Sequence, residues 1–201
     1  MNPRVLVIRT GTANTSSVLA AFRRIGAEPE LVDDAELVRA AEHVVLPGVG
    51  AFAAAMNSLT ARGLDEALRA RIEADRPTLG ICLGLQLLGT TSEESPGASG
   101  LALIAEPITR LRGEVRIPEL GWNRVEPEAG TRWLESGHAY FAHSFCLASK
   151  PAGVSAAWTE HGTRFVSAFE RGALLACQFH PELSGPYGHR LLERWIGGRR
   201  I

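Results

Sequence analysis

Short apolar runs alternate with amphipathic segments through the first half of the chain. Runs rich in branched apolar side chains predict buried β-strands at residues 4–9, 30–32, 43–46 and 77–81. Apolar side chains at helical spacing predict helices at residues 16–25, 35–41 and 51–75, the last one interrupted at Gly63. Because strands that alternate with helices are joined by right-handed crossovers, we expect an α/β fold with a central, mostly parallel open sheet flanked by helices.

The second half of the chain has a different pattern. A polar loop is predicted at residues 90–97, and Pro and Gly separate the apolar runs that follow it. These runs predict short strands at residues 101–105, 108–111, 122–125, 140–147, 155–158, 165–169 and 174–179. A closing helix is predicted at residues 186–195. We therefore expect an additional antiparallel strand region in the C-terminal half, and a single domain over residues 1–201, because no change of composition marks a boundary.

Composition and charge exclude several functional classes. The net charge of −1 offers no electrostatic basis for binding nucleic acid or a membrane surface. The apolar run at residues 5–8 is too short for a signal-peptide core or a membrane span, so we expect a cytoplasmic protein. The cysteines are odd in number and lack metal-ligand spacing, so neither a metal site nor a disulfide framework is expected. Cys146 and Cys177 lie in apolar runs and are expected in the core.

One cysteine has a setting that points to chemistry. Cys82 stands in the segment G-I-C-L-G, between the predicted strand at residues 77–81 and a helix-forming run. This pattern is typical of a nucleophile elbow, a crowded turn from strand to helix in which the flanking residues must be small. The start of a helix favours an anionic sulfur, and its backbone N–H groups can receive an oxyanion. A lone cysteine in an apolar segment is more often a packed core residue, so the elbow needs support from elsewhere in the chain.

That support comes from the segment Q-F-H-P-E at residues 178–182. His180 and Glu182 are two residues apart in an extended segment, so their side chains project in the same direction. A thiol nucleophile needs a base, and the base needs a group that holds its tautomer. Cys82, His180 and Glu182 supply these roles.

Three motifs in this order resemble those of the class I glutamine amidotransferases, in which a Cys-His-Glu triad hydrolyses glutamine. They are P-G-V-G at residues 47–50, G-I-C-L-G-L-Q at 80–86 and Q-F-H-P-E at 178–182. The segments G-W-N at 121–123 and Y-F-A-H-S-F at 140–145 look like those of one branch, the glutaminase subunits of imidazole glycerol phosphate synthases. Two segments depart from this pattern: residues 9–14 lack the usual acidic and aromatic residues, and Glu119-Leu120 stands where a histidine often precedes G-W-N.

The resemblance assigns roles to individual residues. Cys82 attacks the side-chain carboxamide of glutamine, His180 transfers protons and Glu182 orients His180. The backbone N–H groups of Val49 and Leu83 form the oxyanion hole. The residues expected to bind glutamine are Gly50, Gln86, Glu94, His143 and Ser144. His143 has an equally plausible structural role, and Trp122 either fills the core or anchors an interface.

The resemblance also implies a partner and no cofactor. In this branch the ammonia passes to a cyclase subunit, an eight-stranded barrel, so we expect a heterodimer with Asn14, Trp122 and Tyr140 at the interface. We expect weak glutaminase activity in the isolated chain, because the oxyanion loop is built on flexible glycines. The alternatives are an amidotransferase of nucleotide, folate, anthranilate or pyridoxal phosphate synthesis, a non-catalytic binding protein on the same scaffold, and a redox-sensing cysteine protein.

Overall fold

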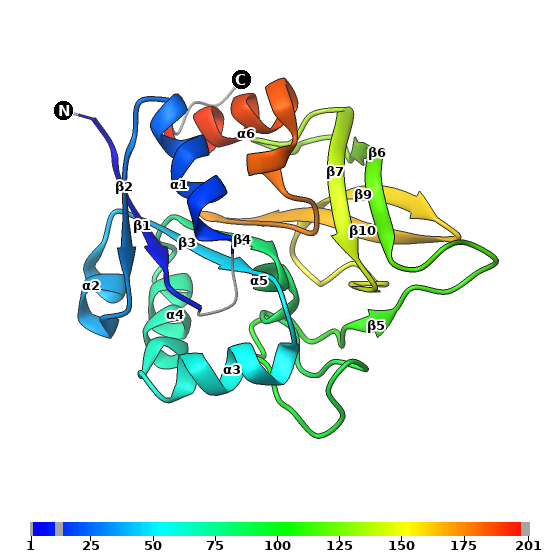
Figure 1. Cartoon of the computed structure of the whole chain (residues 1–201), viewed down its shortest axis with the longest axis horizontal. Coiled ribbons are helices and arrows are strands. Elements are labelled where there is room, and N and C mark those ends of the chain that lie inside the picture. Colours follow the sequence, from blue (N-terminus) through cyan, green and yellow to red (C-terminus); the bar gives the residue numbers. More distant parts are fainter. Residues whose placement is uncertain (1, 11–13, 198–201) are drawn as a thin grey trace.

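The computed structural model describes residues 2–10 and 14–197. Strands and helices alternate along the first half, as predicted (Figure 1). The elements of this half are β1 (Arg4–Ile8), α1 (Thr15–Arg24), β2 (Glu28–Val32), α2 (Ala35–Ala40), β3 (His43–Gly48), α3 (Phe52–Thr60), α4 (Leu64–Glu73), β4 (Thr78–Cys82) and α5 (Leu83–Gln86). The segment at residues 9–14, which departs from the pattern of the resembled family, includes residues 11–13, and these lie outside the described residues.

The second half consists mostly of strands. Its elements are β5 (Thr109–Arg110), β6 (Glu119–Pro127), β7 (Gly137–His143), β8 (Phe145–Cys146), β9 (Ser155–His161), β10 (Thr163–Arg171), β11 (Leu174–Cys177), the 3-10 turn η1 (Pro181–Leu183) and α6 (Gly185–Gly197). The predicted closing helix is therefore confirmed.

Within the described part of the chain, nine strands form one sheet in the order β2-β1-β3-β4-β11-β10-β9-β6-β7. The pairs from β2 to β11 are parallel and the pairs from β11 to β7 are antiparallel. The expected parallel sheet and antiparallel region are thus confirmed, and they are halves of one mixed sheet. The last strand, β11, lies where the halves meet, directly beside β4, which carries the elbow.

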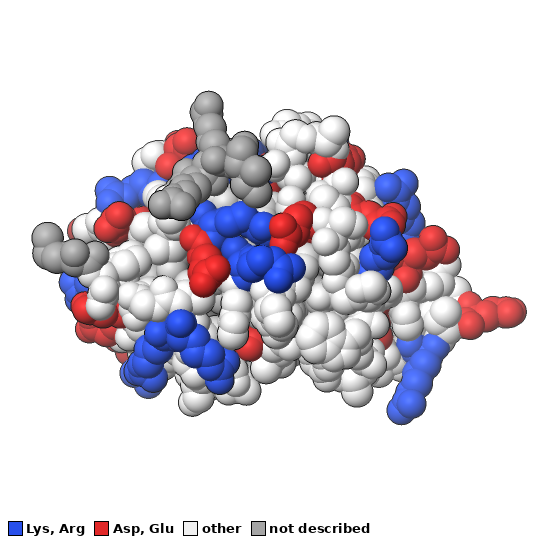
Figure 2. Space-filling model, turned by 90° about the horizontal axis from the view of Figure 1, so that it is seen from above, with Lys and Arg blue, Asp and Glu red and all other residues white. Residues whose placement is uncertain are grey.

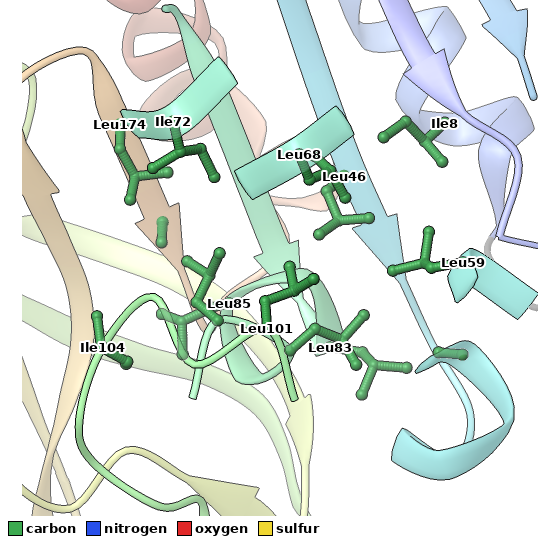
Figure 3. Close-up of a cluster of buried hydrophobic side chains, with 14 of the residues drawn as sticks. Ile8, Leu46, Leu59, Leu68, Ile72, Leu83, Leu85, Leu101, Ile104 and Leu174 are labelled. Carbon is green, nitrogen blue, oxygen red and sulfur yellow. The ribbon is translucent and has the colours of Figure 1, made fainter. Parts of the chain in front are cut away.

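Helices cover both faces of the parallel half. In Figure 1, α1 and α6 lie above the sheet, and α3 and α4 lie below it. Alternate residues of β1 face the two helical layers. Leu6 and Ile8 belong to the core between the sheet and the helices α3 and α4, whereas Val5 and Val7 belong to the core between the sheet and the helices α1 and α6. Figure 3 shows the first of these cores, where side chains of the sheet, α4, α5 and the 101–104 loop pack together. Burial of each such side chain contributes roughly 1.5–3 kcal/mol to stability, which holds the site's elements in place.

Some predicted elements differ from those of the structure. The segment at residues 101–105 is not a strand: the backbone N–H groups of Leu101 and Leu103 donate to the carbonyls of Leu87 and Leu88, just after α5. Apolar residues occur in this segment because it packs against the core as a loop. The predicted strand is therefore wrong, since an apolar run indicates burial and not necessarily a strand. The strand predicted at 140–147 is divided into β7 and β8, and α5 has only four residues. The predicted break at Gly63 is present, with φ at +64° between α3 and α4.

The face seen in Figure 2 carries charges of both signs close together. Among the ion pairs of the described residues, Arg190 and Arg194 of α6 both bond to Glu135. Opposite charges in contact leave little net field over this face, in keeping with the net charge of −1.

Candidate active site

The elbow around Cys82 has the strained geometry that its sequence predicts. Cys82 has φ at +53° and ψ at −107°, a backbone conformation that side chains rarely adopt, and its side chain is buried. A Cβ on Gly84 would overlap the carbonyl oxygen of Leu46 in β3, and one on Gly80 would lie 3.1 Å from the carbonyl carbon of Gly84. Position 84 therefore needs glycine, because the elbow packs directly against the backbone of the neighbouring strand, and position 80 leaves little room for a side chain beside the backbone of Gly84.

The base and the carboxylate reach the elbow because β11 pairs with β4 in parallel, with Cys177 opposite Ile81. The chain beyond β11 therefore continues alongside Cys82. His180 Nδ1 lies 2.9 Å from Glu182 Oε1, and both side chains are buried. The His180 backbone is held on both sides: its N–H donates to the Tyr140 carbonyl at 2.9 Å, and its carbonyl accepts the Ser184 hydroxyl at 2.6 Å.

Cys82 also lies close enough to the His180 side chain to raise the pKa of that imidazole. Burial lowers the pKa of His180. The interactions of the imidazole with Cys82 and Glu182 raise that pKa by more than burial lowers it, so the pKa is about 10. The imidazole therefore holds its proton at neutral pH between two acidic groups. Since Nδ1 faces Glu182, Nε2 is the atom left for the sulfur, which is the arrangement that a thiolate–imidazolium pair requires.

A cavity of about 260 Å³ opens beside Cys82. Every residue predicted for the oxyanion hole or for glutamine binding lines it: Val49, Leu83, Gly50, Gln86, Glu94, His143 and Ser144. A cavity of this size with one thiol, an amide and a carboxylate suits a small polar molecule.

Several of these residues also have structural bonds. Glu94 Oε2 accepts the backbone N–H of Phe52 at 2.7 Å, so this carboxylate caps the start of α3. The Ser144 carbonyl accepts the N–H of Leu111 at 2.9 Å, which fixes the backbone on that side of the cavity. Glu94 and Ser144 therefore line the cavity while these hydrogen bonds fix their orientation.

His143 is part of a buried network. Its Nδ1 lies 3.0 Å from the Phe145 carbonyl oxygen and its Nε2 lies 3.0 Å from Glu119 Oε2. Glu119 Oε1 in turn accepts the Asn123 amide at 2.7 Å. In the sequence, Glu119 stands out only as a departure from the family pattern. Its pairing with His143 arises because the two residues lie opposite each other on β6 and β7, and no local sequence signal indicates it.

A second cavity, also about 260 Å³, is lined in part by residues 47–49. Asn14 and Tyr140 line it together with His180 and Glu182. The Trp122 ring packs edge-on against Tyr140, with 6.2 Å between ring centroids, and 58% of Trp122 is exposed. Two of the three predicted interface residues thus line this cavity, the third packs against Tyr140, and Trp122 is not a core residue.

Exposed apolar side chains other than Trp122 border the two cavities. Leu120 and Val49 line the first cavity and Leu183 lines the second, and Leu120 is 66% exposed. Large exposed apolar side chains that gather in one region mark a surface for a partner.

Within the described residues, no group of three or more His, Cys, Asp or Glu side chains is placed to hold a metal ion. In the same part of the chain, none of the helices combines the length and the apolar character needed to cross a membrane. Cys146 and Cys177 are buried, as expected, and burial raises the pKa of Cys146 to about 12.

Comparisons with known proteins agree with this geometry. The family model of the class I glutamine amidotransferases matches residues 6–197. The imidazole glycerol phosphate synthase subunit HisH of Symbiobacterium thermophilum is 40% identical to this chain over an alignment that covers 98% of this chain and 94% of that protein. The protein of the same name from a Synechococcus species is 43% identical, over 96% of this chain and 92% of its own length.

Solved structures share the fold. A crystal structure described as a glutamine amidotransferase superposes with a TM-score of 0.78 at 21% identity, covering 97% of this chain and 99% of that one. The structure of PurLQS from Thermotoga maritima superposes with a TM-score of 0.74 at 18% identity, covering 98% of this chain and 99% of the other. At such identities the likeness is one of architecture.

Proposed function

This chain belongs to the class I glutamine amidotransferase family, and we propose that it is the glutaminase subunit of an imidazole glycerol phosphate synthase. One observation carries the chemistry: a strained cysteine at the end of β4 interacts with His180, which pairs with Glu182, beside a cavity. The assignment to imidazole glycerol phosphate synthase, among the branches of the family, rests on the relatives of about 40% identity.

In the first half of the proposed reaction, the Cys82 sulfur forms a bond to the side-chain carboxamide carbon of glutamine. The carbonyl π electrons move to oxygen, and the backbone N–H groups of Val49 and Leu83 stabilise the resulting oxyanion. His180 gives its proton to the nitrogen, the carbon–nitrogen bond breaks, and ammonia leaves. A thioester between Cys82 and the glutamyl group remains.

In the second half, water attacks the thioester carbon and His180 takes the proton from that water. The oxyanion forms again and collapses, the carbon–sulfur bond breaks, and glutamate leaves with the Cys82 thiolate restored. Glu182 compensates the charge of the imidazolium in both halves. The proposed contacts of glutamine itself are with Gly50, Gln86, Glu94 and the backbone at residues 143–144, all on the wall of the first cavity.

We also propose the partner and the compartment. The exposed apolar side chains around the cavities suit a covering protein, and a covered site keeps ammonia from water. The proposed partner is the barrel-shaped cyclase subunit, in a cytoplasmic heterodimer, with Asn14, Trp122 and Tyr140 at the interface. The ammonia would serve histidine biosynthesis, forming imidazole glycerol phosphate and an aminoimidazole carboxamide ribonucleotide.

The test measures ammonia release from glutamine by the chain mixed with a cyclase subunit, with and without the cyclase's nucleotide ligand. We expect release to rise when the cyclase and its ligand are both present, and to disappear in Cys82→Ala. The matched control is Cys146→Ala, which removes another buried thiol that does not line the cavity and should keep the activity. Equal ammonia release by the chain and its Cys82→Ala variant would refute the triad.

The alternatives give different outcomes in the same experiments. A non-catalytic protein releases no ammonia with any partner. A redox sensor reacts with peroxide at Cys82 but is not labelled there by an irreversible glutamine analogue. An amidotransferase of another pathway hydrolyses glutamine but does not associate with the cyclase.

A further inference from the structure

The chain contains only two glutamines, Gln86 and Gln178, and their side chains contact each other. Both are buried, and Gln178 has no exposed surface. Gln178 follows β11, whereas Gln86 is the last residue of α5. Neither the proposed triad nor the oxyanion hole uses Gln178, yet its amide nitrogen lies 3.6 Å from the sulfur of Cys82.

The orientation of both amides follows from one backbone carbonyl. The Phe145 carbonyl can only accept a hydrogen bond, so the Gln86 atom that lies 2.8 Å from it is the amide nitrogen. That nitrogen also donates to Gln178, with 3.2 Å between the two side-chain atoms, so the Gln178 atom facing Gln86 is the oxygen. The NH₂ group of Gln178 therefore faces Cys82. A reversed Gln178 amide would place its NH₂ against the NH₂ of Gln86, which is repulsive, and its oxygen against the sulfur, which is repulsive whenever the sulfur is a thiolate.

We propose that Gln178 is a further catalytic residue, whose amide N–H donates a hydrogen bond to the Cys82 sulfur and stabilises its thiolate. The inference rests on the proposed glutaminase function for its role in turnover. An amide suits this task because it carries no charge and does not compete with His180 for the proton. Hydrogen bonds to an ionised group are roughly twice as strong as those between neutral groups, so the bond favours the thiolate over the thiol.

The same chain of bonds reaches the substrate cavity. Both hydrogens of the Gln86 amide are used, one by Phe145 and one by Gln178. Gln86 therefore has its oxygen left for glutamine in the cavity, as an acceptor for the substrate's N–H groups. A hydrogen bond from the substrate to the Gln86 oxygen also fixes the Gln86 amide, which in turn holds Gln178 beside Cys82. A bound substrate therefore keeps the Gln178 donor in place against the Cys82 sulfur.

The test follows the rate of Cys82 alkylation by iodoacetamide from pH 5 to pH 10, with the labelled peptide identified by mass spectrometry. The other thiols do not interfere, since burial raises the pKa of Cys146 to about 12 and raises that of Cys177 well above its ordinary value. The variants are Gln178→Met, which removes the donor at similar volume, and Gln178→Glu, which keeps the shape and turns an oxygen to the sulfur. The matched control is Cys177→Ala, on the strand just before Gln178.

We expect the midpoint of the alkylation profile to rise by about one pH unit in Gln178→Met, which lowers the alkylation rate about tenfold at pH values below both midpoints. Gln178→Glu should shift the midpoint further, and Cys177→Ala should leave it unchanged. Above the midpoint the variants and the unaltered chain should react equally fast, whereas a distorted site lowers the rate at every pH. Unshifted midpoints in both Gln178 variants would overturn the inference.

Glutaminase activity with the cyclase is measured on the same samples. We expect the kcat of Gln178→Met to fall about tenfold with little change in KM. If the unaltered chain releases no ammonia while the alkylation midpoints still shift, the proposed function fails and the hydrogen bond to the sulfur stands. If the unaltered chain is active and the midpoints do not shift, the role of Gln178 fails alone.

Discussion

Replacement of Gly84 by alanine tests the geometry of the elbow. The new Cβ would overlap the carbonyl oxygen of Leu46, an atom of the central strand β3 and not the end of a flexible side chain. Overpacking costs typically about 1–3 kcal/mol, and an obstacle made of backbone places Gly84→Ala at the upper end, about 3 kcal/mol. For a chain of this length that is a fall in Tm of roughly 6–12 °C.

Alanine substitutions at two other glycines should destabilise the chain less than Gly84→Ala does. A Cβ on Gly80 would lie 3.1 Å from the carbonyl of Gly84, a tight contact that a shift of a few tenths of an ångström relieves. Gly80→Ala should therefore cost about 1 kcal/mol, near the lower end of the same range. A Cβ on Gly197 meets nothing within 4 Å, so Gly197→Ala is the control and should keep the Tm.

Calorimetric unfolding and glutamine hydrolysis are the assays for this series. Gly84→Ala should also lose most glutaminase activity, because Leu46 leads directly into the 47–50 loop that lines the cavity. If Gly84→Ala has the Tm and the kcat of the unaltered chain, the close packing of the elbow against β3 is not what positions Cys82.

Two further predictions concern the site's charges. Burial lowers the pKa of His180 but Cys82 and Glu182 raise it, to about 10, so the stability gained from its proton is complete below the ordinary pKa of 6.5 and is lost as the pH rises towards 10. Unfolding free energies measured from pH 6 to pH 10 should fall more steeply for the unaltered chain than for Cys82→Ala, and parallel curves would contradict this. Glu94→Ala removes the cap on the Phe52 N–H and should lower stability by about 1 kcal/mol while raising KM for glutamine. Glu94→Gln keeps an oxygen for the cap, so a KM that rises only when stability falls would show that Glu94 acts through α3 alone.

The alternating first half was predictable because each element has a local cause. The strands near residues 4–9 and 43–46 read as apolar runs because both of their faces are covered, and the break between α3 and α4 follows from one glycine. The elbow was predictable for the same reason, since Gly80 and Gly84 reveal a crowded backbone in the sequence itself.

What was not predictable depends on contacts between distant parts of the chain. The leucine-rich segment at residues 101–105 is buried without pairing to a strand, because the carbonyls that follow α5 take its N–H groups. Glu119 and His143 meet only because β6 and β7 pair in one register. The contact between Gln178 and Cys82 likewise depends on β11 lying beside β4, and no local pattern encodes that neighbour.

The place of β11 in the sheet also determines when the enzyme can first act. Cys82 is made early, whereas β11 begins at Leu174 and His180 follows it, close to the end of the chain. During synthesis on the ribosome, Cys82 is therefore present before its base, His180, and before β11, the strand that joins the two halves of the sheet. A chain that lacks β11 and the residues after it has the nucleophile without its base, so the proposed triad can form only once residues 174–182 are made.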